Sequence, residues 1–524
     1  MPSDQLSLLL LSDAIDRVIA NPTAGHCWLN LMAQARAVTR VELLDEAARL
    51  LAAAVPDQGL PGYYLAAFLD MATGDARHVA QAVACLGQIA PRDLDRHLAF
   101  FHVACQRAFL YAPDRATFRR RLLQGDLAAL AAAIAADVAR LLPLPRRRAR
   151  PRSGEVARVA IVAPLLTQVQ HPPTLMALNQ AEVLMREGVA VRLFTCQESH
   201  IPEQLALVGT GASIPGDAMQ LDRWSEESGS GVVIHGADAR FSILRRYRDM
   251  LQAIDAFDAD VVLLVGLHSG LADALYAQYP VLGLCSNSIA PLAATDVWLT
   301  AHAALDGVVD QPWDGAFPAS LAWHHPYRVR RKPLKHAFSR ASLGLADDAL
   351  VLISVGSQLD QHIAGAWAAR MAALVQERAS LTWLLVGGGG AMPAALAQLP
   401  ADRLRVLAYV PEGWEITACC DVYVNPPVMG GGFAVAEAMS LGVPVVSFAG
   451  SDGGDKVAAR AVDGIDAYFA RLTALLDDGA LRRREGDAMR AHFDAALDLA
   501  HSGPGLLEAC AQAVARYALR VNSA

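Results

Sequence analysis

The sequence predicts an α/β protein in which two Rossmann-like domains follow an all-α domain of helical hairpins. Three observations support this fold class. Apolar residues recur three and four positions apart through the first ~145 residues, as they do in amphipathic helices. Short β-branched runs then alternate with helical segments from residue 156, and the alternation starts again at residue 350. At ~100–200 residues per domain, the 524 residues suit about three domains.

The predicted all-α domain covers residues 1–145 and contains no convincing strand. Trp28, Tyr63 and His97 begin similar blocks about 35 residues apart, which is close to the length of a tetratricopeptide repeat. We therefore expect an array of helical hairpins. Such an array offers a concave surface for a protein partner, or it acts as a scaffold or dimerisation module, and the sequence leaves these alternatives open.

Two α/β segments follow a linker rich in proline and arginine at residues 142–153. Residues 155–335 are expected to form the first Rossmann-like domain and residues 336–500 the second. A last helix in residues 501–524 could pack back on the first. Continuous aliphatic runs predict buried parallel strands in both domains. The strands are expected at residues 156–163, 189–194, 259–265, 281–284, 350–355, 381–386, 404–408, 421–425 and 443–448.

Composition narrows the function classes. The chain is 54% apolar and 19% charged, which is typical of globular proteins. A net charge of −8 argues against a nucleic-acid partner, because phosphate backbones attract clustered Lys and Arg. Eight dispersed cysteines and an N-terminus without signal-peptide features predict a cytoplasmic protein. No stretch reaches the ~18 apolar residues of a transmembrane helix, so we expect no transmembrane segment.

The strongest local signal is a glycine run between a strand and a helix, within residues 421–448. Gly430, Gly431 and Gly432 follow two prolines and open the predicted helix, which carries Glu437. Glycines remove every Cβ from a helix N-terminus, where N–H groups are unsatisfied and the helix dipole is positive. This pattern predicts a pyrophosphate site, with the Glu437 carboxylate accepting hydrogen bonds from ribose hydroxyls.

The block at residues 432–446 resembles the donor site of GT-B glycosyltransferases, whose helix reads E-G-F-G-x4-E-A-M and is followed by G-x-P-V-V. The resemblance implies a nucleotide diphosphate sugar as donor substrate, no other cofactor and no metal ion. It places Gly430, Gly431 and Gly432 at the diphosphate and Glu437 at the ribose. Met429 stands where retaining members carry their first glutamate, so the stereochemical outcome is left open.

Further donor contacts are expected on turns of the second α/β domain. Gly356 and Ser357 follow its first strand, but Ser357 stands where the resembled family has an arginine. Gly387 begins a glycine-rich turn after the next strand. Tyr409 and Val410 are expected to contact the nucleobase, and Asp455 is expected to contact a sugar hydroxyl. These three residues are the last of the donor-binding candidates. For each of these turns an ordinary structural role is the alternative.

Two histidines are candidates for the catalytic base. His171 follows the first strand of the first domain, and His268 follows the strand at 259–265, at the carboxyl end of the sheet where sites form. An imidazole that titrates near neutrality suits removal of a proton from an acceptor hydroxyl. A structural role is the alternative for each. The pair His324 and His325 has no carboxylate or cysteine nearby, so it does not predict a metal site.

Taken together, the residues and the resemblance predict a metal-independent glycosyltransferase. Triple-glycine helices of this kind resemble those of bacterial glycosyltransferases with helical or tetratricopeptide N-terminal regions, some of which glycosylate proteins, so a protein acceptor is expected. The alternatives are a lipid-linked or polysaccharide acceptor, a non-catalytic sugar-nucleotide-binding adaptor, and a two-domain sugar epimerase. The sugar, the nucleobase and the acceptor stay open, and a homo-oligomer is compatible with the sequence.

Overall fold

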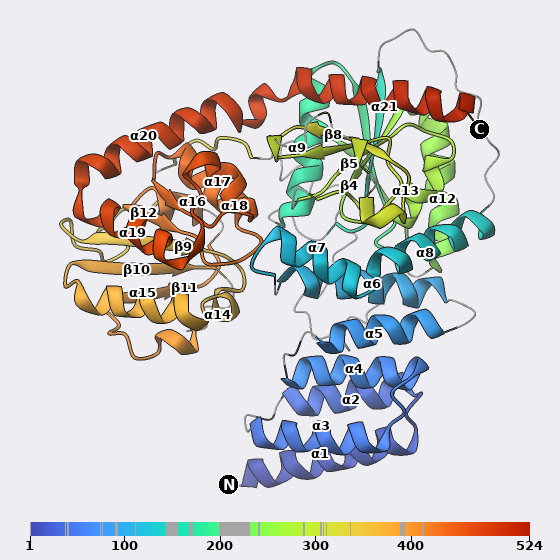
Figure 1. The fold of residues 1–524 in the computed structure, drawn as a ribbon, viewed down its shortest axis with the longest axis horizontal. Helices are drawn as coiled ribbons and strands as arrows, with labels where there is room; N and C mark the ends of the chain where they lie inside the picture. Colours follow the sequence, from blue (N-terminus) through green and yellow to red (C-terminus); the bar gives the residue numbers. More distant parts are fainter. Residues whose placement is uncertain are drawn as a thin grey trace.

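The chain has three parts in the computed structural model, an array of helices and two α/β domains (Figure 1). This confirms the predicted fold class. The predicted linker at residues 142–153 lies outside the described residues except for Leu142. The structure describes the chain except for residues 1, 37, 39–40, 74, 76, 90–92, 111, 143–155, 167–170, 199–230, 239–240, 287–288, 304–306, 308, 311, 328, 336, 388–392, 411–412 and 524.

Helices α1 to α8 form the N-terminal array. Trp28, Tyr63 and His97 lie near the starts of α2, α4 and α6, and all three side chains are buried. The repeat in the sequence therefore reflects equivalent positions on every second helix that pack inside the array. The bounds are α1 Pro2–Ala20, α2 Gly25–Arg36, α3 Val41–Ala54, α4 Gly59–Thr73, α5 Arg77–Gln88, α6 Leu94–Leu110, α7 Arg115–Gln124 and α8 Leu127–Leu141.

The last helices of the array share a hydrophobic core with the first α/β domain. Phe101 of α6 and Ile134 of α8 belong to the same buried cluster as Phe194, which lies in the first sheet. Asp95 of α6 also accepts a hydrogen bond from the backbone N–H of Ile243 at 2.8 Å. Figure 1 shows α6 to α8 lying against this domain, whereas α1 to α4 project away from it. The array is thus continuous with the α/β part of the chain.

The first sheet has the strand order β3-β2-β1-β4-β5-β6-β8-β7, with only β7 antiparallel among the described strands. Alternate residues of β1 belong to two different buried clusters, so the sheet is covered on both faces. Its elements are β1 Arg158–Ala163, α9 Pro172–Arg186, β2 Ala190–Thr195, β3 Val233–Gly236, α12 Ile243–Phe257, β4 Val261–Val265, α13 Gly270–Tyr276, β5 Val281–Leu284, β6 Val297–Thr300, β7 Val309–Asp310 and β8 Ser320–His324.

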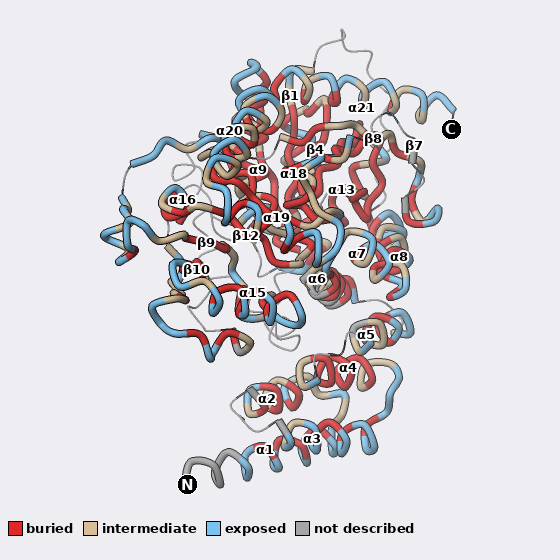
Figure 2. The backbone as a smooth tube through the Cα atoms, turned by 60° about the vertical axis from the view of Figure 1, so that its left-hand side comes forward, coloured by how far each residue is buried: buried red, intermediate tan, exposed pale blue. Residues whose placement is uncertain are grey.

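The second sheet has the order β11-β10-β9-β12-β13, and its described pairs are all parallel. Figure 2 shows the buried residues concentrated in the sheets and in the helix faces turned toward them. The elements are β9 Leu350–Val355, α14 Leu359–His362, α15 Gly365–Glu377, β10 Leu381–Val386, β11 Leu404–Leu407, α16 Gly413–Thr417, β12 Val422–Val424, α17 Gly432–Ser440, β13 Val445–Val446, α18 Asp452–Val457, α19 Gly464–Asp477 and α20 Gly479–Ala496.

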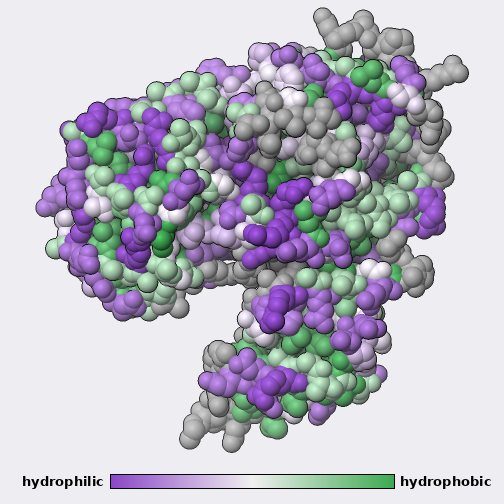
Figure 3. Space-filling view, in the orientation of Figure 1, coloured by the Kyte–Doolittle hydropathy of each residue, from purple (hydrophilic) through white to green (hydrophobic). Residues whose placement is uncertain are grey.

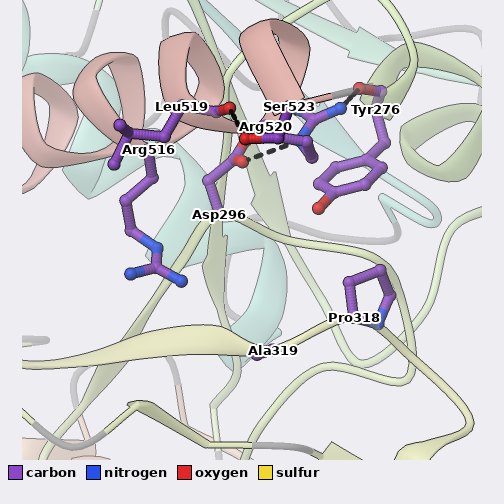
Figure 4. A pocket seen from close by; sticks show the side chains of 8 residues that line it. All are labelled: Tyr276, Asp296, Pro318, Ala319, Arg516, Leu519, Arg520 and Ser523. Atoms are coloured by element: carbon purple, nitrogen blue, oxygen red, sulfur yellow. Dashed lines mark hydrogen bonds and ion pairs between the residues drawn. The ribbon is translucent and has the colours of Figure 1, made fainter.

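The last helix, α21 (Gly503–Ser523), returns to the first α/β domain, as the sequence predicted. Arg520 forms an ion pair with Asp296, with 3.0 Å between Nε and Oδ1, and its guanidinium lies 3.6 Å from the centre of the Tyr276 ring. Figure 4 shows these side chains around a small cavity that Arg516 also lines. The second α/β domain is thereby connected to the first at both of its ends.

Several elements differ from the sequence prediction. Strands β3, β6, β7 and β8 were not predicted. Helices α19 and α20 were also missed.

Within the described residues, no helix taken singly is long and apolar enough to cross a membrane. One bent pair of helices, α7 with α8, reaches the length and apolar composition of a membrane span only when the two helices are taken together.

Candidate donor and acceptor sites

The strand order of the second sheet reverses beside β9. The chain runs from β9 outward to β10 and β11, and then returns to the other side of β9 to form β12. In such sheets a crevice forms at the carboxyl ends of the two strands that flank the reversal, and ligands bind there. The turn at Gly356 follows β9 and the glycine loop follows β12. Both sequence-predicted motifs therefore lie at this edge of the sheet.

Glycines build the start of α17. Gly431 has a φ of +90°, and a Cβ on it would lie 2.4 Å from Oδ1 of the buried Asn425. A Cβ on Gly432 would lie 3.0 Å from Cβ of Asp452. The N-cap residue of α17 is Gly431, which makes no side-chain cap bond to the helix. The first N–H groups of the helix are thus left for another acceptor, and an anion is the partner that the helix dipole favours.

A cation that the sequence analysis missed lies next to Glu437. The Glu437 side chain is 21% exposed on α17, and Lys332 Nζ lies 2.5 Å from its Oε1. Lys332 belongs to the segment that joins the two α/β domains. The resembled family's arginine is absent at Ser357, and Lys332 is the cation that the structure places beside Glu437. No short motif connects residues 105 positions apart.

The turns after β9 and β10 press against each other. The Gly356 N–H donates to the Val386 carbonyl at 3.0 Å. Gly387 has a φ of +122°, and a Cβ on it would lie 2.4 Å from the Gly356 carbonyl oxygen. Packing alone therefore requires glycine at 387. Ser357 is exposed at the same edge, where its hydroxyl can face a ligand.

Tyr409 and Val410 lie further from the reversal point. They follow β11, the outermost strand, which is separated from β9 by β10. Tyr409 is 53% exposed, and Val410 is half-buried against the core of the domain. A nucleobase contact by these residues stays a prediction.

Asp455 has a different partner from the predicted sugar hydroxyl. Its side chain is 6% exposed and forms an ion pair with Arg115 of α7. The nearby Met429 is buried in the hydrophobic cluster of the helical array. The residue that replaces the family's first glutamate therefore points into the array. Neither contact could be foreseen from the sequence, because the array and the glycine loop are more than 300 positions apart. Arg115 and Asp455 are separated by 340 positions.

The first sheet also reverses its strand order, between β1 and β4, and the two candidate histidines follow these strands. His171 immediately precedes α9 at its N-terminus. Its Nδ1 is buried and has no hydrogen-bond partner among the described residues. Burial lowers the pKa of His171 to about 4, so the ring is neutral at pH 7 and can accept a proton.

The environment of His268 does not suit a base that meets an acceptor. The residue is 1% exposed, its Nδ1–H donates to the Leu292 carbonyl at 2.6 Å, and its ring packs edge-on against Phe101 of α6. Burial lowers its pKa to about 4. The sequence suggested a catalytic role because His268 follows a strand at the correct edge. The helical array covers that position, and the structural alternative fits it better.

Next to His268, a buried carboxylate occupies the N-terminus of α13. Glu198 accepts hydrogen bonds from Ser269 Oγ at 2.6 Å and from the Gly270 N–H at 3.1 Å. His102 of α6 lies 3.5 Å from it. Burial alone would raise the pKa of Glu198, but His102, His268 and Ser269 outweigh burial and lower it. The protein therefore supplies its own anion at this helix N-terminus.

The remaining ionisable residues do not form a metal site in the described part of the chain, where no group of three or more His, Cys, Asp and Glu side chains has suitable geometry. Arg330, in the segment between the two α/β domains, pairs with Glu182 of α9. Lys456, beside Asp455, is buried and donates to the Pro326 carbonyl at 3.1 Å.

Residues 349–478, which contain the glycine loop and Glu437, match the family model of glycosyl transferases group 1. No curated protein matches the chain. Among solved structures, a mutant O-GlcNAc transferase from Thermobaculum terrenum shares 13% identity over 98% of this chain and 99% of its own, with a TM-score of 0.52. The lipopolysaccharide outer core galactosyltransferase WaaB shares 13% identity over 67% of this chain and 98% of its own, with a TM-score of 0.46.

A third similar structure is the glycosyltransferase SnogD from Streptomyces nogalater, at 17% identity over 68% of this chain and 99% of its own, with a TM-score of 0.41. The likeness to the Thermobaculum protein extends through the helical array and both α/β domains. The predicted resemblance to GT-B glycosyltransferases with a helical N-terminal region is thereby confirmed.

Proposed function

We propose that this chain, which has the GT-B fold, transfers a sugar from a nucleotide diphosphate sugar to a protein acceptor without a metal ion. The observation that carries the proposal is the start of α17, where glycines and a missing side-chain cap leave backbone N–H groups at the point of strand reversal. The family match covers this same segment. The alternative of a two-domain epimerase has no observation in its favour.

On the donor side, the diphosphate would bind the N–H groups of α17 and the ribose would bind Glu437. The helix N-terminus stabilises the charge that develops on the leaving diphosphate, which is the task that a metal ion performs in other transferases. Lys332 neutralises Glu437 in the structure and would add positive charge near the phosphates. Asp455 is not retained as a sugar ligand, because its side chain is only 6% exposed and its carboxylate pairs with Arg115, whereas the paired Glu437 side chain is 21% exposed.

On the acceptor side, His171 is the retained candidate for the base. It lies at the reversal point of the first sheet, and its Nδ1 has no partner within the described residues. A neutral imidazole accepts the proton of the attacking group while a bond forms to the sugar. A folded-state pKa of about 4 makes it a weak base in the absence of substrate.

A protein acceptor is supported by the helical array and by the full-length likeness to a protein named O-GlcNAc transferase. Large apolar side chains are exposed on the outer helices, including Leu9 at 69% and Leu50 at 48%. Figure 3 shows apolar as well as polar residues on the visible face of the array. Exposed apolar residues of this kind favour contact with another protein.

None of the eight cysteines, all described, forms a disulfide, which supports a cytoplasmic location.

The test is turnover of a panel of nucleotide sugars, measured as released nucleoside diphosphate, with and without candidate acceptor proteins. We expect turnover with at least one donor, and a loss of about tenfold or more in kcat/KM for Glu437→Ala. Unchanged turnover in Glu437→Ala would remove the basis of the proposal. Binding of a nucleoside diphosphate without transfer to any acceptor would favour the adaptor alternative, and transfer only to lipid-linked or glycan acceptors would correct the acceptor class.

A further inference from the structure

The turn between α6 and α7 of the helical array contacts the glycine loop directly. The Met429 N–H donates to the Ala112 carbonyl at 2.9 Å, and the Met429 carbonyl accepts from the Asp452 N–H at 2.8 Å. The Met429 side chain is 1% exposed and belongs to the array's hydrophobic cluster. A Cβ on Gly430 would lie 3.4 Å from Cζ of Phe109. The Met429 N–H and side chain are therefore held by contacts with the array, and its carbonyl is held by the Asp452 N–H.

Arg115, the first residue of α7, makes a second connection on the same side. Its backbone N–H donates to the Gly450 carbonyl at 2.7 Å. Its guanidinium pairs with Asp455, and the two side chains are only 16% and 6% exposed. Asp455 lies in α18, the helix that begins with Asp452, whose N–H holds Met429. A continuous chain of contacts thus runs from Arg115 through α18 to the residue that precedes the three glycines.

The glycine loop needs such support because its own residues provide little. Three successive glycines have no side chains to pack, and each gains more conformational freedom on release than another residue would. An anion site made of backbone N–H groups binds tightly only if those groups are held in place before the ligand arrives. Breaking a largely buried ion pair by removing one partner also leaves the other charge uncompensated, so the Arg115–Asp455 contact resists separation.

We propose that Arg115 is a positioning residue for the donor site, which acts through Asp455 and α18 to hold the loop at Met429 and the following glycines. The helical array is then an obligatory part of the donor site in addition to any role in binding the acceptor. This inference rests on the proposed function, since it assumes that the donor diphosphate binds at α17.

The experiment measures the Kd of UDP, GDP, ADP, CDP and dTDP by calorimetry for the full-length chain, and then follows the tightest ligand through a double-mutant cycle of Arg115→Ala and Asp455→Ala. We expect each single variant to raise Kd by about tenfold and the double variant to raise it no further, because both changes break one contact. Arg115→Lys keeps the positive charge and should recover most of the affinity.

Arg119→Ala is the matched control. Arg119 lies one turn further along α7, where it faces the exposed Asp314 of the first domain at 3.7 Å, so its loss should change Kd by less than about twofold. An unchanged Kd in folded Arg115→Ala, or an equal rise in Arg119→Ala, overturns the positioning role while wild-type binding still supports the proposed function. A larger rise for Asp455→Ala than for Arg115→Ala also overturns it, since Asp455 would then contact the donor itself.

Two further outcomes decide the remaining cases. Should Arg115→Ala fail to fold, Asp455→Asn replaces it, because this change removes only the charge of the partner. A rise of about tenfold in the Kd of Asp455→Asn then supports the inference, and an unchanged Kd overturns it. Should the wild-type chain bind none of the five diphosphates, the proposed function fails and this inference fails with it.

Discussion

In each α/β domain a helix begins at the carboxyl edge of the sheet, beside the point of strand reversal. The two helix N-termini differ in how their first N–H groups are capped. In the first domain, Glu198 and Ser269 hydrogen-bond to the first N–H groups of α13, and α6 of the array covers them. In the second domain, the N-cap residue of α17 is Gly431, which makes no side-chain cap bond. The first helix N-terminus is completed by the protein's own carboxylate, and we propose that the diphosphate of a ligand completes the second.

From the sequence, an anion site was assigned to the glycine loop alone, and His268, beside α13, was proposed only as a candidate base. Both helix N-termini are preceded by a strand and contain glycine, and His268 and Glu437 have residue types that are common in active sites. The distinguishing feature is Glu198, which follows another strand and lies 71 positions before Ser269. We expect four measurable consequences of the difference between the two helix N-termini, and they decrease in size.

The largest effect is expected from Glu198→Ala. The change leaves the Gly270 N–H and the Ser269 hydroxyl buried without their acceptor, so the first domain should lose ~3–5 kcal/mol of stability. Thermal unfolding followed by calorimetry measures the loss. Glu46→Ala, which breaks an exposed pair with Arg49, is the control and should cost ~0.5 kcal/mol or less. Equal stability of the two variants would show that Glu198 does not complete the α13 N-terminus.

The next effect is on the open site. Gly431→Ala should weaken binding of a nucleoside diphosphate about thirtyfold, because the new Cβ would strike Asn425 and displace the loop, a cost of ~2 kcal/mol. Gly464→Ala is the matched control. It also has a positive φ of +81° at the start of a helix in the same domain, but a Cβ there meets no atom within 4 Å. A comparable loss of affinity in both variants would mean that backbone strain, and not the anion site, is responsible.

A smaller effect separates the roles of Glu437 and Lys332. Glu437→Ala should raise the Kd of the diphosphate about tenfold through lost ribose contacts, and Lys332→Ala about threefold through lost charge near the phosphates. Because the two side chains form an ion pair, the double variant should raise Kd by less than the product of the two effects even when both residues face the ligand. Two equal, small effects that do not add would reduce the pair to an interdomain salt bridge. Calorimetric titrations of the three variants decide between these interpretations.

The smallest effect concerns pH. Burial raises the pKa of Asp273 on α13 to about 8, so the folded state holds a proton that the unfolded state releases near pH 4. The stability that this bound proton gives to the folded state is fully present below pH 4 and is lost as the pH rises to 8. His171 and His268, with pKa values lowered to about 4, act oppositely: their contribution is present above pH 6.5 and is lost toward pH 4.

Between pH 6.5 and 8 only the Asp273 contribution changes among these three groups. The wild-type Tm of the first domain should therefore fall by about 2–4 °C across this interval, for a loss of ~1 kcal/mol. Asp273→Asn, which cannot titrate, should remove that fall. A fall of the same size in Asp273→Asn would assign it to other groups.

The sequence predicted the fold class and the longer elements, because long β-branched runs and helical periodicity report burial on each segment directly. Residues 350–355 and 381–386 were placed without error as β9 and β10. Short strands such as β7, Val309–Asp310, depend on a neighbour for their hydrogen bonds and leave no periodic signal.

The candidate site was predictable where its chemistry is local. The glycines, Glu437 and the Met429 departure all lie within one strand–loop–helix unit, so their arrangement follows from the sequence itself. Arg115 and Lys332 could not be found in this way, because they reach the site from the array and from the interdomain segment. Burial of His268 likewise depends on α6, which precedes it by more than 150 positions.

The central claim, that the open start of α17 is the anion site, is tested most directly by a crystal structure of the chain with the nucleoside diphosphate that it binds tightest. We expect phosphate oxygens within hydrogen-bond distance of the backbone N–H groups at Gly432 and Phe433, and ribose hydroxyls on Glu437. A diphosphate bound away from these residues, with α17 still unoccupied, would contradict the claim.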